Sequence, residues 1–147
     1  MEKLILERDE NDYYRLEIND KGDFIEFDLT DIGLAERVMK ASEEIDKLNK
    51  KYTEKEIKIN NEIKDETEKS RQFINLECEK DRELRKQFDS FLGEGACQKI
   101  FGDKKKVGQY AMLMEALEPH FAKMQIQMKK AKNKLVQKYL PKKNDVM

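Results

Sequence analysis

"FLGEGACQKIFGD", residues 91–103, interrupts a chain whose other residues have mostly the pattern of charged helices. It sets Gly93 and Gly95 one residue apart beside Cys97 and closes on Ile-Phe-Gly at residues 100–102. Glycine is common where a helix ends, because it adopts the left-handed backbone that the chain needs there. The stretch is therefore a phosphate-binding loop, a site for a reactive thiol or an elbow between two helices, and each alternative implies a different function.

The residues around these glycines favour the elbow. A phosphate-binding loop needs the spacing Gly-x4-Gly-Lys-Ser/Thr after a buried strand, whereas these glycines follow an apolar helical face and no serine or threonine follows a lysine in the stretch. A catalytic Cys97 needs a base, and the single histidine, His120, follows Pro119 in the next segment without a supporting motif. We expect Cys97 to be a small apolar group in a tight turn. The elbow, residues 93–106, is assigned to Gly93, Gly95, Ile100, Phe101 and Gly102.

The composition indicates an elongated helical protein. Of the 147 residues, 41% are charged and 38% are hydrophobic, whereas a typical globular domain has about 25% charged residues. Long helices accommodate this excess, because every turn has outward positions and opposite charges four residues apart attract. Residues 103–147 hold eleven lysines against two aspartates and two glutamates, a net charge of +7 that leaves −8 for residues 1–102. The two parts should attract each other or a partner of opposite charge.

Residues 13–29 alternate apolar and polar side chains with the two-residue period of a strand. The apolar positions are Tyr14, Leu16 and Ile18, followed by Phe24 and either Ile25 or Phe27. Between them, NDKGD at residues 19–23 supplies the residue types of a tight reversal. We predict a β-hairpin within an N-terminal unit of residues 1–30. Because two strands are marginally stable in water, KLILER at residues 3–8 adds a third strand, or the hairpin packs on a helix or a second subunit.

Residues 31–92 predict a long helical arm, with Thr30 or Asp31 as its cap. Its first part has the alternating three- and four-residue steps of a coiled coil or helical hairpin, at Leu34, Val38, Ala41, Ile45, Leu48 and Tyr52. The apolar spacing then thins in a segment without Gly or Pro, where a long exposed helix is expected and a break within residues 60–72 stays open. An apolar face resumes at Phe73 and ends at the glycines.

Residues 107–140 have the clearest periodicity, an apolar three-four spacing that stays in phase across Pro119. Proline inside a helix costs about 3 kcal/mol and kinks it, so we expect one kinked helix or two helices meeting end to end, with Pro141 as the stop before a tail at residues 141–147. Methionines on this face fill a core or form an adaptable partner-binding surface. The candidate partner-binding residues are Tyr110, Met114, Leu117, Phe121, Met124, Met128 and Leu135. The fold class is mainly α: an N-terminal β-hairpin, a long charged helix, a glycine elbow and a C-terminal kinked amphipathic helix, in a helical-hairpin or coiled-coil-like arrangement.

No catalytic, cofactor-binding or metal-binding site is predicted. One histidine and two cysteines do not provide a nucleophile, a base and an oxyanion donor together, and no convergent set of metal ligands is found. The lysine-rich tail lacks the arginines and interleaved aromatic residues of nucleic-acid-binding surfaces, so we expect a solvated lysine face there. No window approaches the ~18 apolar residues of a membrane span and the N-terminus is no signal peptide, so we expect a cytoplasmic protein with reduced cysteines.

The order of these parts resembles the small tail assembly chaperone-like proteins encoded in the tail-gene modules of phages and prophages of Gram-positive bacteria. The shared signature, FLGEG...KIFG before the last helix, is carried by Phe88, Asp89, Phe91, Leu92, Gly93, Gly95, Cys97, Lys99, Ile100, Phe101 and Gly102. The resemblance implies a non-enzymatic protein without a cofactor, acting in the cytoplasm of the host cell. It would bind the tape-measure protein, keep the apolar helices of this client from aggregating and recruit tail-tube subunits.

Two other non-enzymatic functions would use the same apolar faces. One is a structural or scaffolding component of the tail, and the other is a homo-oligomeric coiled-coil adaptor unrelated to phages. We expect a protein partner, and self-association of the chain into a homo-oligomer.

Overall fold

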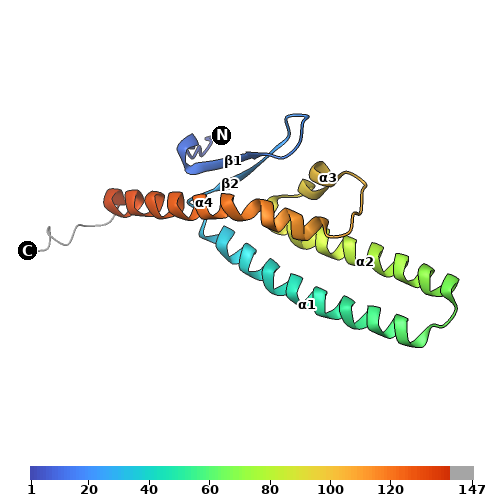
Figure 1. The fold of residues 1–147 in the computed structure, drawn as a ribbon. Coiled ribbons are helices and arrows are strands. Elements are labelled where there is room, and N and C mark those ends of the chain that lie inside the picture. The colour runs from blue at the N-terminus through green and yellow to red at the C-terminus, as the bar shows by residue number, and fades with distance from the viewer. Residues whose placement is uncertain (140–147) are drawn as a thin grey trace, which may run out of the picture.

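The computed structural model describes residues 1–139 and is mainly helical, with one antiparallel β-hairpin near the N-terminus (Figure 1). This architecture confirms the predicted fold class. In chain order the elements are the 3-10 helix η1 (Glu10–Asp12), β1 (Tyr13–Glu17), β2 (Phe24–Asp28), α1 (Ile32–Glu62), α2 (Glu66–Leu92), α3 (Ala96–Phe101) and α4 (Gln109–Tyr139). The predicted tail at residues 141–147 and the stop at Pro141 lie outside the described residues.

The β-hairpin forms where the alternation predicts it, and its register pairs Leu16 with Ile25. At its reversal the Asn19 side-chain oxygen accepts the Lys21 and Asp23 backbone N–H groups, so the turn is fixed locally. Ile25 and Phe27 both face the core, which leaves Phe24 on the opposite face and 51% exposed. The prediction that Phe24 lies on the apolar face is therefore wrong, because the period of two selects residues 25 and 27 together.

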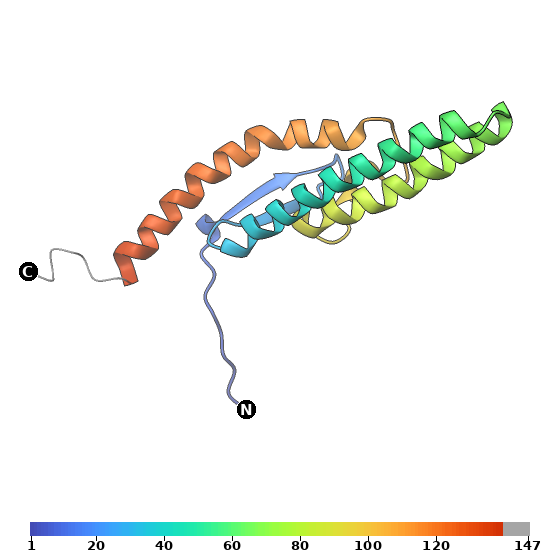
Figure 2. The ribbon, with the colours of Figure 1, turned by 90° about the horizontal axis from the view of Figure 1, so that it is seen from below.

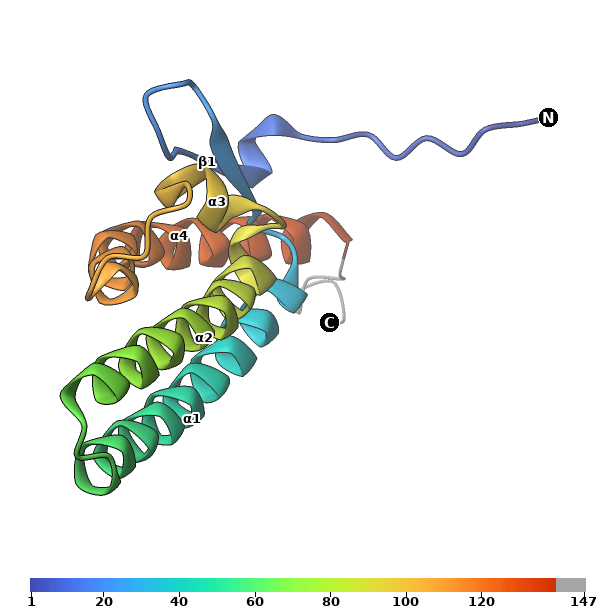
Figure 3. The same ribbon diagram turned by 90° about the vertical axis from the view of Figure 1, so that its right-hand side faces the viewer.

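Residues 3–8 do not add a third strand, since the described sheet contains only β1 and β2. The hairpin instead packs on helices, the other alternative that the sequence leaves open. Leu16 and Ile18 of its first half contact the core as half-buried side chains. Residues 1–9 form an exposed N-terminal arm that runs away from the body (Figures 2 and 3).

The predicted helical arm of residues 31–92 folds back on itself as two antiparallel helices, α1 and α2 (Figure 1). Asp31 caps α1 by accepting the Gly33 N–H at 2.8 Å, and Asp65 caps α2 by accepting the Glu68 N–H at 3.0 Å. The break at residues 63–65 falls within the window of residues 60–72. It occurs there because the Asp65 carboxylate satisfies a backbone N–H group that has no partner inside the helix.

Tyr52 joins the two helices near the middle of the hairpin. Its ring is fully buried, and its hydroxyl donates a 2.6 Å hydrogen bond to Glu83. Burial and this bond raise the pKa of Tyr52, and the same bond lowers the pKa of the Glu83 carboxyl group. Lys51 also approaches Glu83, at 3.5 Å, so the carboxylate is held from two sides.

The hydrophobic core lies where β2, the start of α1, the end of α2, α3 and the first half of α4 meet. Its buried residues are Ile25, Phe27, Leu29, Leu34, Ala41, Leu84, Phe88, Phe91, Leu92, Ala96, Cys97, Tyr110, Leu113, Leu117 and Met124. Pro119 lies inside α4, which is a single helix curving along the body (Figure 2), so of the two alternatives for this segment the kinked helix is the one that forms. Within residues 1–139, no helix has the length and apolar character needed to cross a membrane.

Candidate functional site

The glycine elbow connects α2 to α4 and contains the short helix α3, so Cys97 lies in a helix and not in the predicted tight turn. Gly93 ends α2 with φ 118° and ψ 150°, and Gly95 follows in the left-handed region with φ 78°. Gly102, with φ 63°, ends α3. These φ angles explain the glycines, since side chains strain the backbone in this region.

The two large apolar residues of the elbow join it to the core. Ile100 and Phe101 are half-buried and pack against the core. The Phe101 ring meets the Tyr110 ring edge to face, with 5.4 Å between centroids, and thereby links α3 to the start of α4.

Cys97 is fully buried in α3 and behaves as a core residue. Its backbone N–H donates to the Asp89 carboxylate at 2.9 Å, and its Sγ lies 3.8 Å from the Arg85 carbonyl oxygen. Burial raises the pKa of the Cys97 thiol, which opposes formation of a thiolate nucleophile. His120 is hydrogen-bonded through Nδ1 to the Tyr14 hydroxyl at 2.6 Å, so its ring serves the contact between β1 and α4.

A buried polar cluster fastens the first turn of α4 to α2. Asp81 Oδ1 accepts a 3.0 Å hydrogen bond from Gln109 and a 2.8 Å hydrogen bond from the Tyr110 hydroxyl. Burial and the bond to Asp81 raise the pKa of Tyr110 to about 12. Arg85, one turn along α2, donates to the Gln98 side chain and to the Gly102 carbonyl oxygen, and so ties the elbow to the same helix. No motif in the sequence predicts this cluster.

The candidate partner-binding residues of α4 divide into three groups. Tyr110, Leu117 and Met124 are buried in the core of the chain itself, and Phe121 and Met128 are half-buried against it. Met114 and Leu135 are each 40% exposed. Leu113, which the predicted spacing omits, takes the core position in place of Met114. In this conformation, therefore, only part of the predicted surface is open to a partner.

The apolar stripe of α4 continues past the body of the protein. Steps of seven, four and seven residues lead from Leu117 through Met124 and Met128 to Leu135, which keeps these side chains on one face of the helix. Leu117 and Met124 are buried, Met128 is half-buried, and residues 132–138 are all exposed. The stripe thus leaves the core at about Met128. The outer end of α4 extends past the other elements of the body (Figures 1 and 2).

Lysines surround the emerging part of this stripe. The described segment from Phe121 to the end of α4 contains no acidic residue and six lysines, at positions 123, 129, 130, 132, 134 and 138. Lys134 lies 3.7 Å from Asp9, which places the base of the N-terminal arm beside this basic segment. A surface of this kind is suited to a partner that combines an apolar stripe with acidic flanks.

A groove of about 430 Å³ lies between α3, the loop after it and the first turns of α4. It is lined by Ile100, Phe101, Lys104, Lys106, Gln109, Met112, Leu113 and Ala116. Met112 is 67% exposed at its edge, and its floor is mostly apolar. The groove is therefore a second surface on which an apolar segment could be buried.

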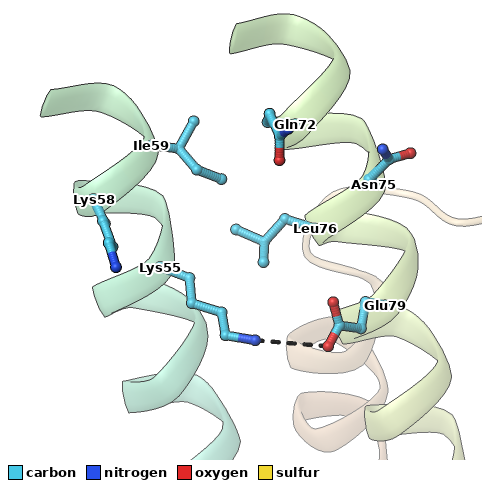
Figure 4. A pocket seen from close by; sticks show the side chains of 7 residues that line it. All are labelled: Lys55, Lys58, Ile59, Gln72, Asn75, Leu76 and Glu79. Carbon is cyan, nitrogen blue, oxygen red and sulfur yellow. Dashed lines mark ion pairs between the residues drawn. The ribbon is translucent and has the colours of Figure 1, made fainter. Parts of the chain in front are cut away.

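A smaller hollow of about 270 Å³ lies between α1 and α2 near the tip of their hairpin (Figure 4). Lys55, Lys58 and Ile59 reach it from α1, and Gln72, Asn75, Leu76 and Glu79 reach it from α2. The ammonium group of Lys55 lies 3.7 Å from the Glu79 carboxylate. Because this ion pair crosses the hollow, the hollow offers less unpaired charge to a ligand.

In the part of the chain that the structure describes, no group of three or more His, Cys, Asp or Glu side chains could hold a metal ion. No curated protein and no solved structure matches the chain. The profile of DUF6673, described as a family of unknown function, matches residues 21–145, a span that begins within the β-hairpin reversal and includes β2, α1, α2, the elbow and α4. The chain therefore belongs to the DUF6673 family.

Proposed function

We propose that the protein is a non-enzymatic tail assembly chaperone that acts in the cytoplasm of a phage-infected or prophage-carrying cell. In this function it holds apolar helical segments of the tape-measure protein on the outer half of α4 until the tail assembles around them. The client helix lies along the stripe that begins at Met128 and continues over Leu135, with Val136 beside it.

The main support for this proposal is that the apolar stripe of α4 continues beyond the part of the helix that the core covers. Leu135 and Val136 are 40% and 42% exposed on a helix that the body no longer covers. Because only about two-fifths of each side chain is exposed, burying the rest against a client would contribute about 0.6–1.2 kcal/mol for each residue. A helix laid in an apolar seam is a common mode of peptide recognition, with contacts at steps of three and four residues.

The lysines beside the stripe define the client further. They favour a client helix with acidic residues on its flanks. They also keep the outer half of α4 soluble when no client is bound. Attraction between exposed charges is screened by salt. Capture of the client should therefore weaken as the ionic strength rises, although the apolar contact persists.

The elbow supports the proposal through the family resemblance of its sequence. The signature residues Gly93, Gly95 and Gly102 set the path from α2 to α4, and Phe101 packs on the first turn of α4. The signature residues thus set the direction in which α4 runs along the body and past it.

The test is capture of purified tape-measure segments from the tail module that encodes the protein. Replacing Leu135 and Val136 with Glu should weaken capture at least about tenfold, because each change puts a charge into the apolar contact. Ile57→Glu is the matched control, since Ile57 is 55% exposed on α1, far from the stripe in sequence. Equal capture by the double variant and the control would refute the proposal.

Mass spectrometry of purified phage particles tests the assembly function separately. A chaperone is released before the tail is complete, so the protein should be missing from the particles. Its presence there in fixed proportion to the tail-tube protein would instead assign it as a structural component of the tail.

A further inference from the structure

The N-terminal arm, residues 1–9, exposes three consecutive aliphatic side chains that nothing in the described structure covers. Leu4, Ile5 and Leu6 are 87%, 72% and 83% exposed. Glu2 and Lys3 precede them in the sequence, and Glu7 follows them directly. An extended apolar segment of this kind is a common feature of a surface that becomes buried against another polypeptide.

The base of the arm is held to the body. Arg8 forms an ion pair with Glu26 of β2, and its guanidinium group lies 3.6 Å from the centre of the Tyr13 ring. Asp9 lies 3.7 Å from Lys134 near the outer end of α4. The arm therefore leaves the body from a defined point (Figures 2 and 3).

The groove between α3 and α4 matches the arm in chemistry. Its apolar lining includes Phe101, Met112 and Leu113, and Lys104 and Lys106 also line it. An aliphatic tripeptide followed by a glutamate is complementary to an apolar floor with two lysines beside it. The occupant that this pattern favours is the arm itself.

The arm does not reach the groove of its own chain. Met112 and Lys134 are separated by about 33 Å along α4, at about 1.5 Å per residue. Ile5 is four residues from Asp9, and this length of chain spans at most about 14 Å. Even when the side chains of the Asp9–Lys134 pair are included, roughly 13 Å, Ile5 falls about 6 Å short of Met112.

We propose that the arm of one chain occupies the groove of a second copy. Leu4, Ile5 and Leu6 lie on the apolar floor, and Glu7 approaches Lys104 and Lys106. Reciprocal exchange of two arms closes a two-fold dimer in which neither arm remains exposed. This surface is separate from the proposed client stripe, so the two proposals can fail independently.

Light scattering coupled to gel filtration tests the dimer with the full chain. The wild type should elute as a dimer, and Ile5→Glu and Met112→Glu should each raise its dissociation constant at least about tenfold. Ile57→Glu, an equivalent change on α1, should leave the dimer intact. Circular dichroism should show the same helix content in all three variants, because each site is exposed. A wild type that stays monomeric at the highest attainable concentration would overturn the proposal.

Cross-linking between two chains that each carry one exposed cysteine, besides the buried Cys97, identifies the contact. In a Cys78→Ser background, a chain with Ile5→Cys and another with Met112→Cys should form a disulfide-linked heterodimer on mixing under oxidising conditions. An equivalent mixture of Ile5→Cys and Ile57→Cys chains should not. A third chain carries both Ile5→Cys and Met112→Cys. If the cross-link forms only within this chain and not between chains, the arm folds back on its own chain, and this result would also refute the exchange.

Discussion

Replacing Asp81 with Ala should be among the most destabilising single substitutions in this protein, although Asp81 belongs to no sequence motif. Asp81 is buried, and its carboxylate accepts hydrogen bonds from the Gln109 side chain and the Tyr110 hydroxyl. Both donors are themselves buried, so truncation of the carboxylate leaves two polar groups without their partner. Arg85, whose Nε lies 3.9 Å from the carboxylate, also loses the charge that faces it.

The magnitude follows from these contacts. A hydrogen bond to a charged group contributes about 1.5–3 kcal/mol, and removing one partner of a buried charged network costs about 3–5 kcal/mol. A shift of about 2–4 °C in the melting temperature for each kcal/mol then gives a decrease of roughly 6–20 °C. Urea denaturation followed by circular dichroism at 222 nm measures the free energy of unfolding directly.

Two further variants make the measurement decisive. Tyr110→Phe removes one of the two bonds and should cost about 1–2 kcal/mol, and its cost should shrink when Asp81 is already Ala, with a coupling of about 0.5–3 kcal/mol. Glu43→Ala on the exposed face of α1 should stay within about 0.5 kcal/mol of the wild type. An Asp81→Ala variant as stable as Glu43→Ala would refute the assignment of this cluster as the fastening of α4.

Three other outcomes are expected. Raising the pH should destabilise the fold, first above the ordinary pKa of 9.0 for Cys97 and then above pH 10 for Tyr52 and Tyr110, because the unfolded chain releases protons that the folded chain retains. In thermal melts, Tyr110→Phe should reduce the second loss, and Tyr52→Phe should reduce it further. A thiol-specific dye should modify the partly exposed Cys78 in the native protein and Cys97 only after unfolding, so equal rates would contradict the burial of Cys97. Gly93→Ala should cost about 1–3 kcal/mol in chemical denaturation through backbone strain alone, since no atom lies within 4 Å of the added methyl group, and an unchanged midpoint would argue against the positive φ.

The features that were predictable from the sequence are those with a local cause. The two-residue period of residues 13–29 produced the hairpin, and the periodic spacing from residue 107 onward produced α4. The chain reversal at residues 63–65 could be predicted only to within residues 60–72, because this segment contains several polar residues that could cap a helix as Asp65 does. The sequence alone does not show which of them begins α2.

The features that were missed depend on contacts between distant segments. Leu113 and Met114 both fit a helical stripe, and only the position of the surrounding core selects Leu113 for burial. Asp81 meets Gln109 and Tyr110 across 28 and 29 residues of sequence, and nothing near any of the three predicts the encounter. The exposed part of the stripe could not be identified either, since the spacing is the same before and after α4 leaves the body.

The contact between the β-hairpin and α4 also fixes the order of folding during synthesis. The Tyr14–His120 hydrogen bond joins positions 106 residues apart, whereas α1 and α2 can pair as soon as the short turn between them has formed. A ribosome adds about 5–20 residues per second. The ring of Phe27, which meets Phe121 in the finished core, therefore waits on the order of 5–20 s for its neighbour to be made. During this interval a nascent chain exposes the inner face of β2, so translation that stalls before α4 should yield insoluble product.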